Sequence, residues 1–340
     1  MANPTQYELD FDDIGDVDPD GHIKYLLSKV KARNAPGTYR MRRTDILDFA
    51  SWLADDPYQD AETITDVDAM TIGDYIDDVA ADGYAESTVE RRYDSVRMLY
   101  SRLTGEYGVM EEDPFEHLTK KKFENQLKGT KKGKELAEKV TYVTEEEKEQ
   151  IADAVEEPTL RNELIVRILW QTGARRGELA NMRLDKIDRD RRAIEVENIK
   201  KNDPDDPTRT VFYQSSLDFL LNQWIDGGYR DAWDVAAESP YLFVGGRNEH
   251  IRETKVGEIV KQAAIDAGVN EVVYEDAAGC ERWRIGAHEL RHGHAVHAIK
   301  SGIDVRTLQA HLGHSSLEMT MVYLDLVDED VREAYKAFGD

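Results

Sequence analysis

The chain has 340 residues, 40% of them apolar, and is therefore long enough for two domains that each bury a core. With 44 basic and 69 acidic residues, its formal net charge of −25 argues against a protein that binds nucleic acid through a generally basic surface. The single cysteine excludes an internal disulfide, and we find neither an apolar run of membrane-spanning length nor the features of a signal peptide. We therefore expect a cytoplasmic protein that crosses no membrane.

The acidic residues are spread along the whole chain, a composition typical of proteins that work in molar salt. At about 1 M salt the Debye length is about 3 Å, so distant carboxylates repel a phosphate backbone only weakly. We therefore expect a halophilic protein in which local basic segments can still contact DNA. Residues 1–22 carry seven acidic residues and no lysine or arginine, which predicts an acidic, flexible leader.

Apolar residues at helical spacing indicate an all-α domain over residues 23–118. Short connections between the helices favour a bundle. Basic residues, Arg91 and Arg92 among them, lie between the apolar positions and could meet phosphate groups. The expected helices run from Ile23 to Val30, from Thr38 to Leu53, from about Ala69 to Ala81, and from Ser87 or Thr88 to Gly105.

Residues 119–139 differ from the rest of the chain because they contain eight lysines and only three glutamates. No sustained apolar periodicity runs through this stretch, which therefore predicts a linker between two domains. A basic segment in so acidic a chain favours contact with a phosphate backbone. The candidate DNA-binding residues here are Lys120, Lys121, Lys122, Lys131 and Lys132.

Residues 140–340 are expected to form a second, mainly helical domain. A buried helix should end at Gly173, so that Arg175 lies at the mouth of a rigid turn, as a phosphate clamp requires. Two alternating stretches with an acidic, proline-bearing turn between them predict a β-hairpin. Further elements are expected as a helix starting at Thr144, hairpin strands at Ala193–Ile199 and Arg209–Tyr213, a helix from Leu217 to Trp224, a short buried strand at Tyr241–Val244 and a helix from Lys255 to Ala267.

The stretch from His288 to Tyr323 carries the densest set of chemically active side chains. His288 and Arg291 are three residues apart and so share one face of a helix, where an imidazole and a guanidinium can converge on an anion. Gly313 predicts a helix end, which places His314 just beyond it. Tyr323 follows nine residues later, on a short helix.

These residues resemble the signature of the tyrosine recombinases, the phage-integrase and Xer-like family. The C-terminal motifs are His288-x-x-Arg291-His292, then Leu312-Gly313-His314, then Tyr323, and the upstream arginine motif is Thr172-Gly173-Ala174-Arg175. The resemblance implies a multidomain fold. An N-terminal all-α core-binding domain would be followed by a mainly α catalytic domain with a small β-hairpin.

The resemblance also implies the roles of six residues: Arg175, Lys201, His288, Arg291, His314 and Tyr323. The two arginines and His314 would bind the scissile phosphate, and Tyr323 would attack it to form a 3′-phosphotyrosyl bond. His288 is the candidate for moving the tyrosine proton. Lys201 would protonate the departing 5′ oxygen, with Lys200 as the alternative lysine.

Two further residues flank this set. His292 is expected to support the active site by packing or hydrogen bonding, and Arg176 is a candidate contact to the DNA backbone. The chemistry implied needs neither a metal nor a cofactor. The implied partners are double-stranded DNA and three further copies of the chain, in a tetramer that exchanges C-terminal helices from residues 327–340.

The implied function is site-specific DNA recombination, for integration and excision or for Xer-like resolution. One alternative is a relative that recognises a DNA site without cutting it. A second alternative is a zinc hydrolase, because His288-Glu289-Leu290-Arg291-His292 also matches the H-E-x-x-H motif. The zinc hypothesis lacks a third ligand and gives no role to Arg175, His314 or Tyr323.

Overall fold

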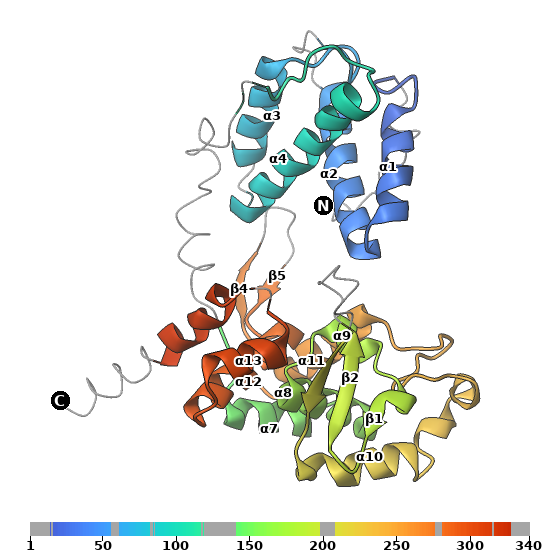
Figure 1. Cartoon of the computed structure of the whole chain (residues 1–340), viewed down its shortest axis with the longest axis vertical. Helices are drawn as coiled ribbons and strands as arrows, with labels where there is room; N and C mark the ends of the chain where they lie inside the picture. Colours follow the sequence, from blue (N-terminus) through green and yellow to red (C-terminus); the bar gives the residue numbers. More distant parts are fainter. Residues whose placement is uncertain are drawn as a thin grey trace, which may run out of the picture. The chain divides into compact units, whose positions relative to one another are not determined.

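The computed structural model describes residues 14, 16–55, 61–81, 84, 86–116, 118, 141–197, 208–275, 281–314 and 316–327. The chain divides into two compact units, residues 1–139 with 275–280 and residues 140–274 with 281–340, and each has a hydrophobic core of its own. Figure 1 shows the helices of the first unit in blue to teal and the elements of the second unit in green to red. None of the described helices is both long and apolar enough to span a bilayer.

The first unit is all-α, as predicted. Its helices are α1 (His22–Arg33), α2 (Pro36–Asp55), α3 (Ala69–Ala81) and α4 (Glu86–Ser101), and α4 continues into the π-helical turn η2 (Arg102–Glu106). The apolar face predicted for α1, from Ile23 to Val30, is buried. Helix α2 begins at Pro36, two residues before the predicted start, because proline suits the first helical position.

The structure differs from the expected flexible leader at the end of that segment. Ile14 and Val17 are only 2% and 3% exposed and belong to the core of the first unit. The carboxylate of Asp18 accepts hydrogen bonds from the backbone N–H groups of His22 and Ile23, both at 2.8 Å. Residues counted as leader for their charge therefore begin the bundle. The basic segment 119–139 lies outside the described residues.

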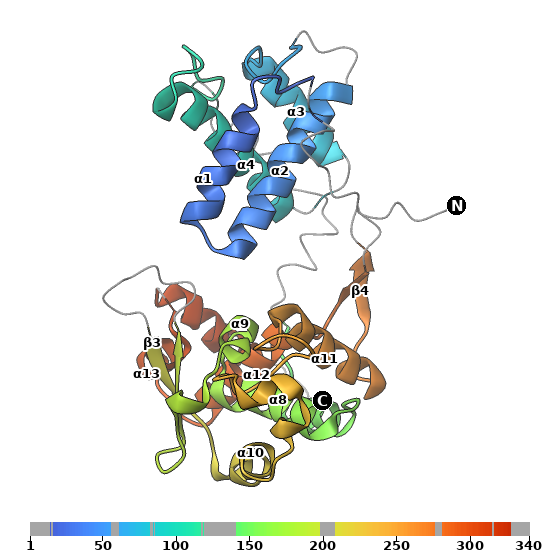
Figure 2. The ribbon, with the colours of Figure 1, turned by 90° about the vertical axis from the view of Figure 1, so that its right-hand side faces the viewer.

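The second unit is built around α8, whose residues are buried on nearly every side. Helices α7, α10 and α12 pack against it, and Figure 2 shows α10 beneath it. Most expected helices are present, within one or two residues of their predicted ends. The helices are α7 (Glu145–Asp153), α8 (Thr159–Thr172), α9 (Arg176–Ala180), α10 (Asp218–Ile225), α11 (Glu253–Asp266), α12 (Ala287–Lys300) and α13 (Val305–Leu312). Residues 318–327 form one further helix. Short helical turns occur at η4 (Leu184–Lys186), η5 (Ser215–Leu217), η6 (Arg230–Ala232) and η7 (Asp234–Ala237).

Two small antiparallel sheets accompany these helices. The predicted hairpin is present as β2 (Ala193–Glu197) and β3 (Thr208–Phe212), with Ala193 opposite Phe212, and β1 (Ile187–Asp188) pairs with β2. The bend at residues 198–207, which carries Lys200 and Lys201, lies outside the described residues. A second hairpin of β4 (Val272–Glu275) and β5 (Glu281–Trp283) was not predicted.

The strand predicted at Tyr241–Val244 is wrong. Leu242, Phe243 and Val244 are fully buried, as their apolar character suggests, but no strand ladder forms. Tyr241 makes an isolated bridge with Arg183 instead. A short apolar run indicates burial, and periodicity alone does not distinguish a buried strand from a buried turn.

Candidate active site

The turn after α8 depends on Gly173. Its φ is 60°, in the left-handed region that favours glycine. A Cβ atom here would lie 2.7 Å from His294 Cδ2 and 2.8 Å from Leu312 Cδ2, so the packing also leaves no room for a side chain. The turn delivers Arg175 to the start of α9, where its backbone N–H donates to Glu178 Oε2 at 2.8 Å.

Glu178 holds two arginines and is only 1% exposed. Its Oε1 accepts hydrogen bonds from Arg175 Nη1 and Arg209 Nη1, each at 2.8 Å, and its Oε2 accepts from Arg209 Nη2 at 2.7 Å. Burial raises the pKa of Glu178, but the hydrogen bonds and charge of Arg209, followed by those of Arg175, outweigh burial and lower it to about 2. The carboxylate is therefore ionised.

The guanidinium of Arg291 bridges two turns. Arg291 lies on α12 and is 1% exposed. Its Nη1 donates to the Gly173 carbonyl at 2.5 Å and its Nη2 to the Leu312 carbonyl at 2.8 Å. Burial, followed by the charge of Arg175, lowers its pKa to about 9, which leaves it cationic at neutral pH. Carbonyl partners do not neutralise this charge, so it remains able to attract an anion.

His314 follows Gly313, whose φ of 66° ends α13 as predicted. Burial, followed by the charges of Arg291 and Arg175, lowers the pKa of His314 to about 4, so the ring is neutral at pH 7. Its Nδ1 lies 2.8 Å from Oγ1 of Thr320, which is fully buried. The two atoms are hydrogen-bonded, and when the hydroxyl is the donor the ring proton is on Nε2.

Tyr323 lies within residues 318–327 and is 3% exposed. Its Oη is 2.8 Å from His292 Nδ1, and its ring stacks 6.2 Å from the ring of His314. Burial raises the pKa of Tyr323, although the charges of Arg291 and Arg175 oppose this. Burial, followed by the charges of His288 and Arg291, lowers the pKa of His292 to about 3. The neutral His292 ring and the phenol therefore share a hydrogen bond, in which Nδ1 accepts the phenolic hydrogen when the ring proton is on Nε2.

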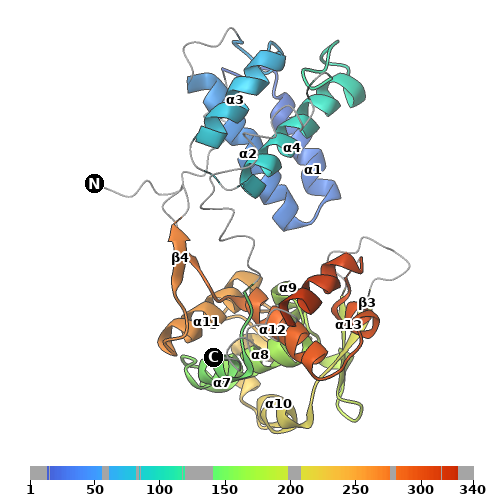
Figure 3. The same ribbon diagram turned by 90° about the vertical axis from the view of Figure 1, so that its left-hand side faces the viewer.

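The described elements bring five of the six predicted catalytic residues into one region. Figure 3 shows α13 between α12 and β3, beside α9, and these elements carry or adjoin the arginines and His314. His288 is exposed and its ring lies 4.3 Å from that of His292. The sixth residue, Lys201, and the alternative Lys200 lie outside the described residues.

The proposed DNA contacts are placed unevenly. The side chain of Arg92 is 13% exposed, pairs with Asp48 at 2.7 Å and covers the ring of Tyr84. Its charge is therefore already engaged in contacts within the first unit. Arg91 pairs with Asp45 at 2.5 Å but keeps 32% of its side chain exposed. Arg176 is 54% exposed. The five lysines of the predicted linker lie outside the described residues.

Three residues of the site were missed in the sequence: Glu178, Arg209 and Thr320. Glu178 carried one usable signal, because it is three residues from Arg175 at a helix start. Arg209 contacts His311, 102 residues away in sequence, and no local pattern indicates such a contact.

The residues of the H-E-x-x-H motif are engaged in other contacts. Glu289 Oε2 accepts the backbone N–H of Gly286 at 2.8 Å, and His292 Nδ1 faces Tyr323. Among the residues that the structure describes, no group of three or more His, Cys, Asp and Glu side chains could hold a metal ion. This geometry favours the phosphate-binding interpretation of the motif.

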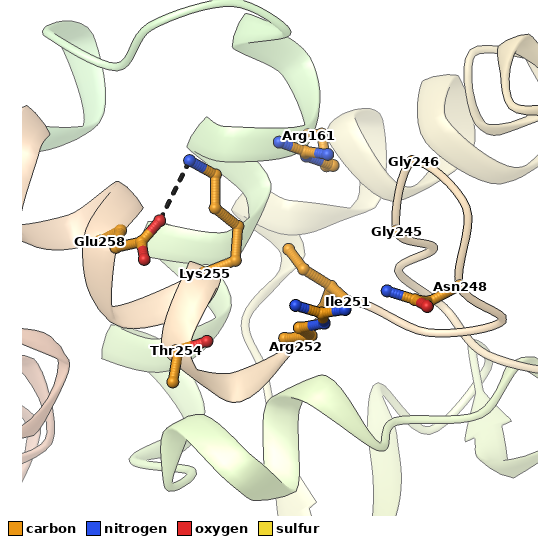
Figure 4. Close-up of a pocket in the computed structure, with 9 residues that line it drawn as sticks. All are labelled: Arg161, Gly245, Gly246, Asn248, Ile251, Arg252, Thr254, Lys255 and Glu258. Atoms are coloured by element: carbon orange, nitrogen blue, oxygen red, sulfur yellow. Dashed lines mark ion pairs between the residues drawn. The ribbon is translucent and has the colours of Figure 1, made fainter. Parts of the chain in front are cut away.

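A separate cavity of about 340 Å³ occurs in the second unit (Figure 4). Arg161 and Lys255 line it, and Lys255 pairs with Glu258 at 3.3 Å. Arg161 lies near the first residue of α8, whereas Arg175 follows the last, and a helix of 14 residues is about 20 Å long. The residues that line the cavity include none of the six candidate catalytic residues.

Residues 141–330 match the phage integrase family. The tyrosine recombinase XerC of Corynebacterium glutamicum is 29% identical over 283 residues, which cover 82% of each chain. The tyrosine recombinase XerA of Pyrococcus furiosus is 29% identical over 195 residues, 56% of this chain and 59% of the relative.

Two solved structures share the fold. The XerH site-specific recombinase bound to palindromic difH substrate has a TM-score of 0.66 at 16% identity, with 100% of this chain and 92% of that chain covered. A lambda integrase fragment bound to a COC′ core site has a TM-score of 0.62 at 16% identity, with 89% and 94% covered. These likenesses confirm the predicted fold class of a helical domain followed by a mainly α domain with a small sheet.

Proposed function

The chain belongs to the phage integrase family, and on this premise we propose that it is a tyrosine-type site-specific recombinase, which cuts and rejoins DNA strands through a 3′-phosphotyrosyl intermediate. The observation that supports this most is the cluster of two guanidiniums, a neutral imidazole and a phenol around the Gly173 turn. Such a cluster suits a phosphodiester that accumulates negative charge during attack by an oxygen nucleophile.

Arg175 and Arg291 would bind the nonbridging oxygens of the scissile phosphate. Glu178 divides its negative charge between Arg175 and Arg209, so it does not fully neutralise Arg175, and Arg291 donates to the carbonyls of Gly173 and Leu312. His314 would add a hydrogen bond from Nε2, the nitrogen that Thr320 leaves protonated. These donors are fixed before substrate arrives, which lowers the reorganisation needed as charge develops.

Tyr323 would attack phosphorus through Oη. Its proton would pass to His292 Nδ1, which lies 2.8 Å from Oη, while the new bond from phosphorus to Oη forms and the bond to the 5′ oxygen breaks. His288, whose ring adjoins His292, would take part in moving the proton onward. The phosphotyrosyl bond conserves the energy of the broken linkage, so a second DNA 5′ hydroxyl can reverse the reaction.

Lys201 would protonate the 5′ oxygen as it leaves, with Lys200 as the alternative. A duplex with sulfur in place of the bridging 5′ oxygen tests this, because a thiol has a pKa of about 8.5 and leaves without a proton. The variant of the true acid, Lys201→Ala or Lys200→Ala, should lose activity on oxygen and recover it on sulfur. Failure of both variants to recover would exclude both lysines as the acid.

Duplex DNA would be held by local cations in a halophilic, cytoplasmic setting, for which the net charge of −25 is the support. The candidates are Lys120, Lys121, Lys122, Lys131, Lys132, Arg91 and Arg176, whereas the ion pair of Arg92 with Asp48 makes that residue a weaker candidate. Four copies would assemble on DNA and exchange C-terminal helices. Met319 and Val322 support this, since they are 47% and 40% exposed beside the nucleophile.

Covalent capture tests the function. The chain is incubated in molar potassium chloride with nicked duplexes that have a randomised central segment, and adducts that survive denaturation are recovered and sequenced. Wild type should accumulate a protein–DNA adduct on a defined sequence, and Tyr323→Phe should bind that sequence and form none. Sequence-specific binding without an adduct in wild type would favour a recognition protein that does not cut.

A further inference from the structure

Arg209 lies on β3 and its side chain is 8% exposed. All three guanidinium nitrogens donate hydrogen bonds. Nε donates to the carbonyl of His311 at 2.9 Å, Nη1 to Glu178 Oε1 at 2.8 Å and Nη2 to Glu178 Oε2 at 2.7 Å. A planar guanidinium with a bidentate carboxylate and a third fixed acceptor has little freedom to move.

These three bonds join three separate pieces of the chain. Glu178 belongs to α9 and also binds the side chain and backbone of Arg175. His311 lies in the last turn of α13, three residues before His314. Arg209 itself is the second residue of β3 and comes eight residues after Lys201 in the sequence. Each piece therefore adjoins a different candidate catalytic group.

We propose that Arg209 is a positioning residue for phosphodiester cleavage, which keeps Arg175 available to the phosphate and fixes the His314 turn against β3. This inference rests on the function proposed above. Arg209 acts through Glu178 and through the carbonyl of His311, and it makes no contact with DNA in this role.

The charge balance explains why a second arginine is needed. Glu178 carries one negative charge in a buried position, and two guanidiniums share it, which leaves one net positive charge at the site. Without Arg209, the carboxylate would interact with Arg175 alone. A buried carboxylate with one guanidinium partner binds it tightly. Arg175 would therefore bind a substrate phosphate more weakly.

Arg209→Gln tests the proposal, with the duplex recovered by covalent capture from wild type as the probe. The maximal rate of adduct formation should fall about 100-fold, the scale seen when one electrostatic donor is lost from a transition state. The DNA concentration for half-maximal rate should change less than about threefold, because binding across the rest of the duplex is retained. Arg189→Gln is the matched control, since Arg189 also pairs through two nitrogens with a carboxylate, Asp226, but lies at the surface.

The double variant Arg209→Gln with Glu178→Gln separates positioning from simple support of the fold. Removal of the buried charge releases Arg175, so the double variant should be at least about tenfold faster than Arg209→Gln. A purely structural role predicts a double variant as slow as the single one or slower. Either that result or a single variant within about threefold of wild type would overturn the proposal.

Two controls keep the outcomes distinct. If wild type forms no adduct while Tyr323→Phe is equally inactive, the proposed function fails before Arg209 is examined. If circular dichroism shows that Arg209→Gln does not fold, the proposal is tested with Arg209→Lys instead. Lysine keeps a charge near Glu178 without the fork geometry, so the maximal rate should fall about tenfold at an unchanged half-maximal DNA concentration. A wild-type rate in Arg209→Lys would contradict the proposal.

Discussion

His292 Nδ1 lies 2.8 Å from Oη of Tyr323, so in the mechanism we propose, His292, and not His288, is first to receive the tyrosine proton. Spacing in the sequence favours His288 for that role because it shares a helix face with Arg291. In the structure His288 is exposed, and its ring lies 4.3 Å from the ring of His292. With a pKa of about 3, His292 is neutral at pH 7 but weakly basic, so it is suited to passing the proton on to His288 and not to holding it.

Replacement of His292 should therefore slow cleavage more than replacement of His288. Asparagine keeps an acceptor near the position of Nδ1 but is not basic. His292→Asn should lower the rate of adduct formation about 100-fold, within the range for loss of a general base, and His288→Asn by less than about tenfold. Both rates are measured on the same nicked duplex at saturating DNA. A slower His288 variant would return the proton-accepting role to His288.

Gly173→Ala should destabilise the second unit strongly. The added methyl group meets both the left-handed backbone, with φ of 60°, and side-chain atoms of His294 and Leu312 within 2.8 Å. Gly228→Ala is the matched control, because φ there is 77° but the nearest atom, on Asp231, is 4.0 Å away. Each alanine costs about 1–2 kcal/mol for the backbone. Gly173→Ala should lose about 1–3 kcal/mol more from overpacking.

Urea unfolding, followed by tryptophan fluorescence, gives the loss in free energy of unfolding for each variant. Equal losses would contradict the close approach of His294 and Leu312 to Gly173.

Folding stability should fall below about pH 6. Burial, followed by the charge of His311, lowers the pKa of His294 to about 3, and the unfolded value is about 6.5. The unfolded chain therefore binds a proton that the folded chain does not. The effect of His294 on the free energy of unfolding is absent above about pH 6.5. As the pH falls towards 3, protonation of the unfolded chain lowers that free energy by about 1.4 kcal/mol per pH unit. His292 and His314 act in the same direction.

His294→Gln isolates this effect, because glutamine keeps an N–H donor for the Trp170 carbonyl and does not titrate. The free energy of unfolding should depend less steeply on pH in the variant than in wild type between pH 6 and pH 4. Burial raises the pKa of Glu289, which opposes the trend in both proteins equally. Parallel pH profiles for the two chains would show that His294 is not neutral when folded.

Local features of the sequence predicted most of the fold. The bounds of α3, Ala69–Ala81, follow from its apolar periodicity. The ends of α8 and α13 follow from Gly173 and Gly313. Both features depend on residues that are close together in the sequence. The buried run at Tyr241–Val244 was assigned to a strand, since burial was evident but its hydrogen-bond partners were not.

In the candidate site, too, local patterns indicated some residues, and others depended on distant contacts. Arg175, Arg291, His314 and Tyr323 could be found from motifs and spacing. Their partners could not, because those contacts join positions far apart in the chain or depend on helix packing. Arg92 shows the same limit, since its local pattern predicts a phosphate contact and gives no sign of its ion pair with the distant Asp48.

The hydroxyl of Thr320 should set the tautomer of His314. Both groups are buried and Oγ1 lies 2.8 Å from Nδ1, and we expect the hydroxyl to donate to Nδ1 while Nε2 carries the ring proton. Thr320→Val preserves the shape and removes that hydrogen bond, whereas Thr320→Ser retains it. A neutral hydrogen bond contributes about 1 kcal/mol, so the valine variant should form adduct about five- to tenfold more slowly and serine at nearly the wild-type rate. Nitrogen-15 NMR of His314 gives the tautomer directly. A wild-type ring already protonated at Nδ1 would show that His314 cannot donate from Nε2 in its neutral form.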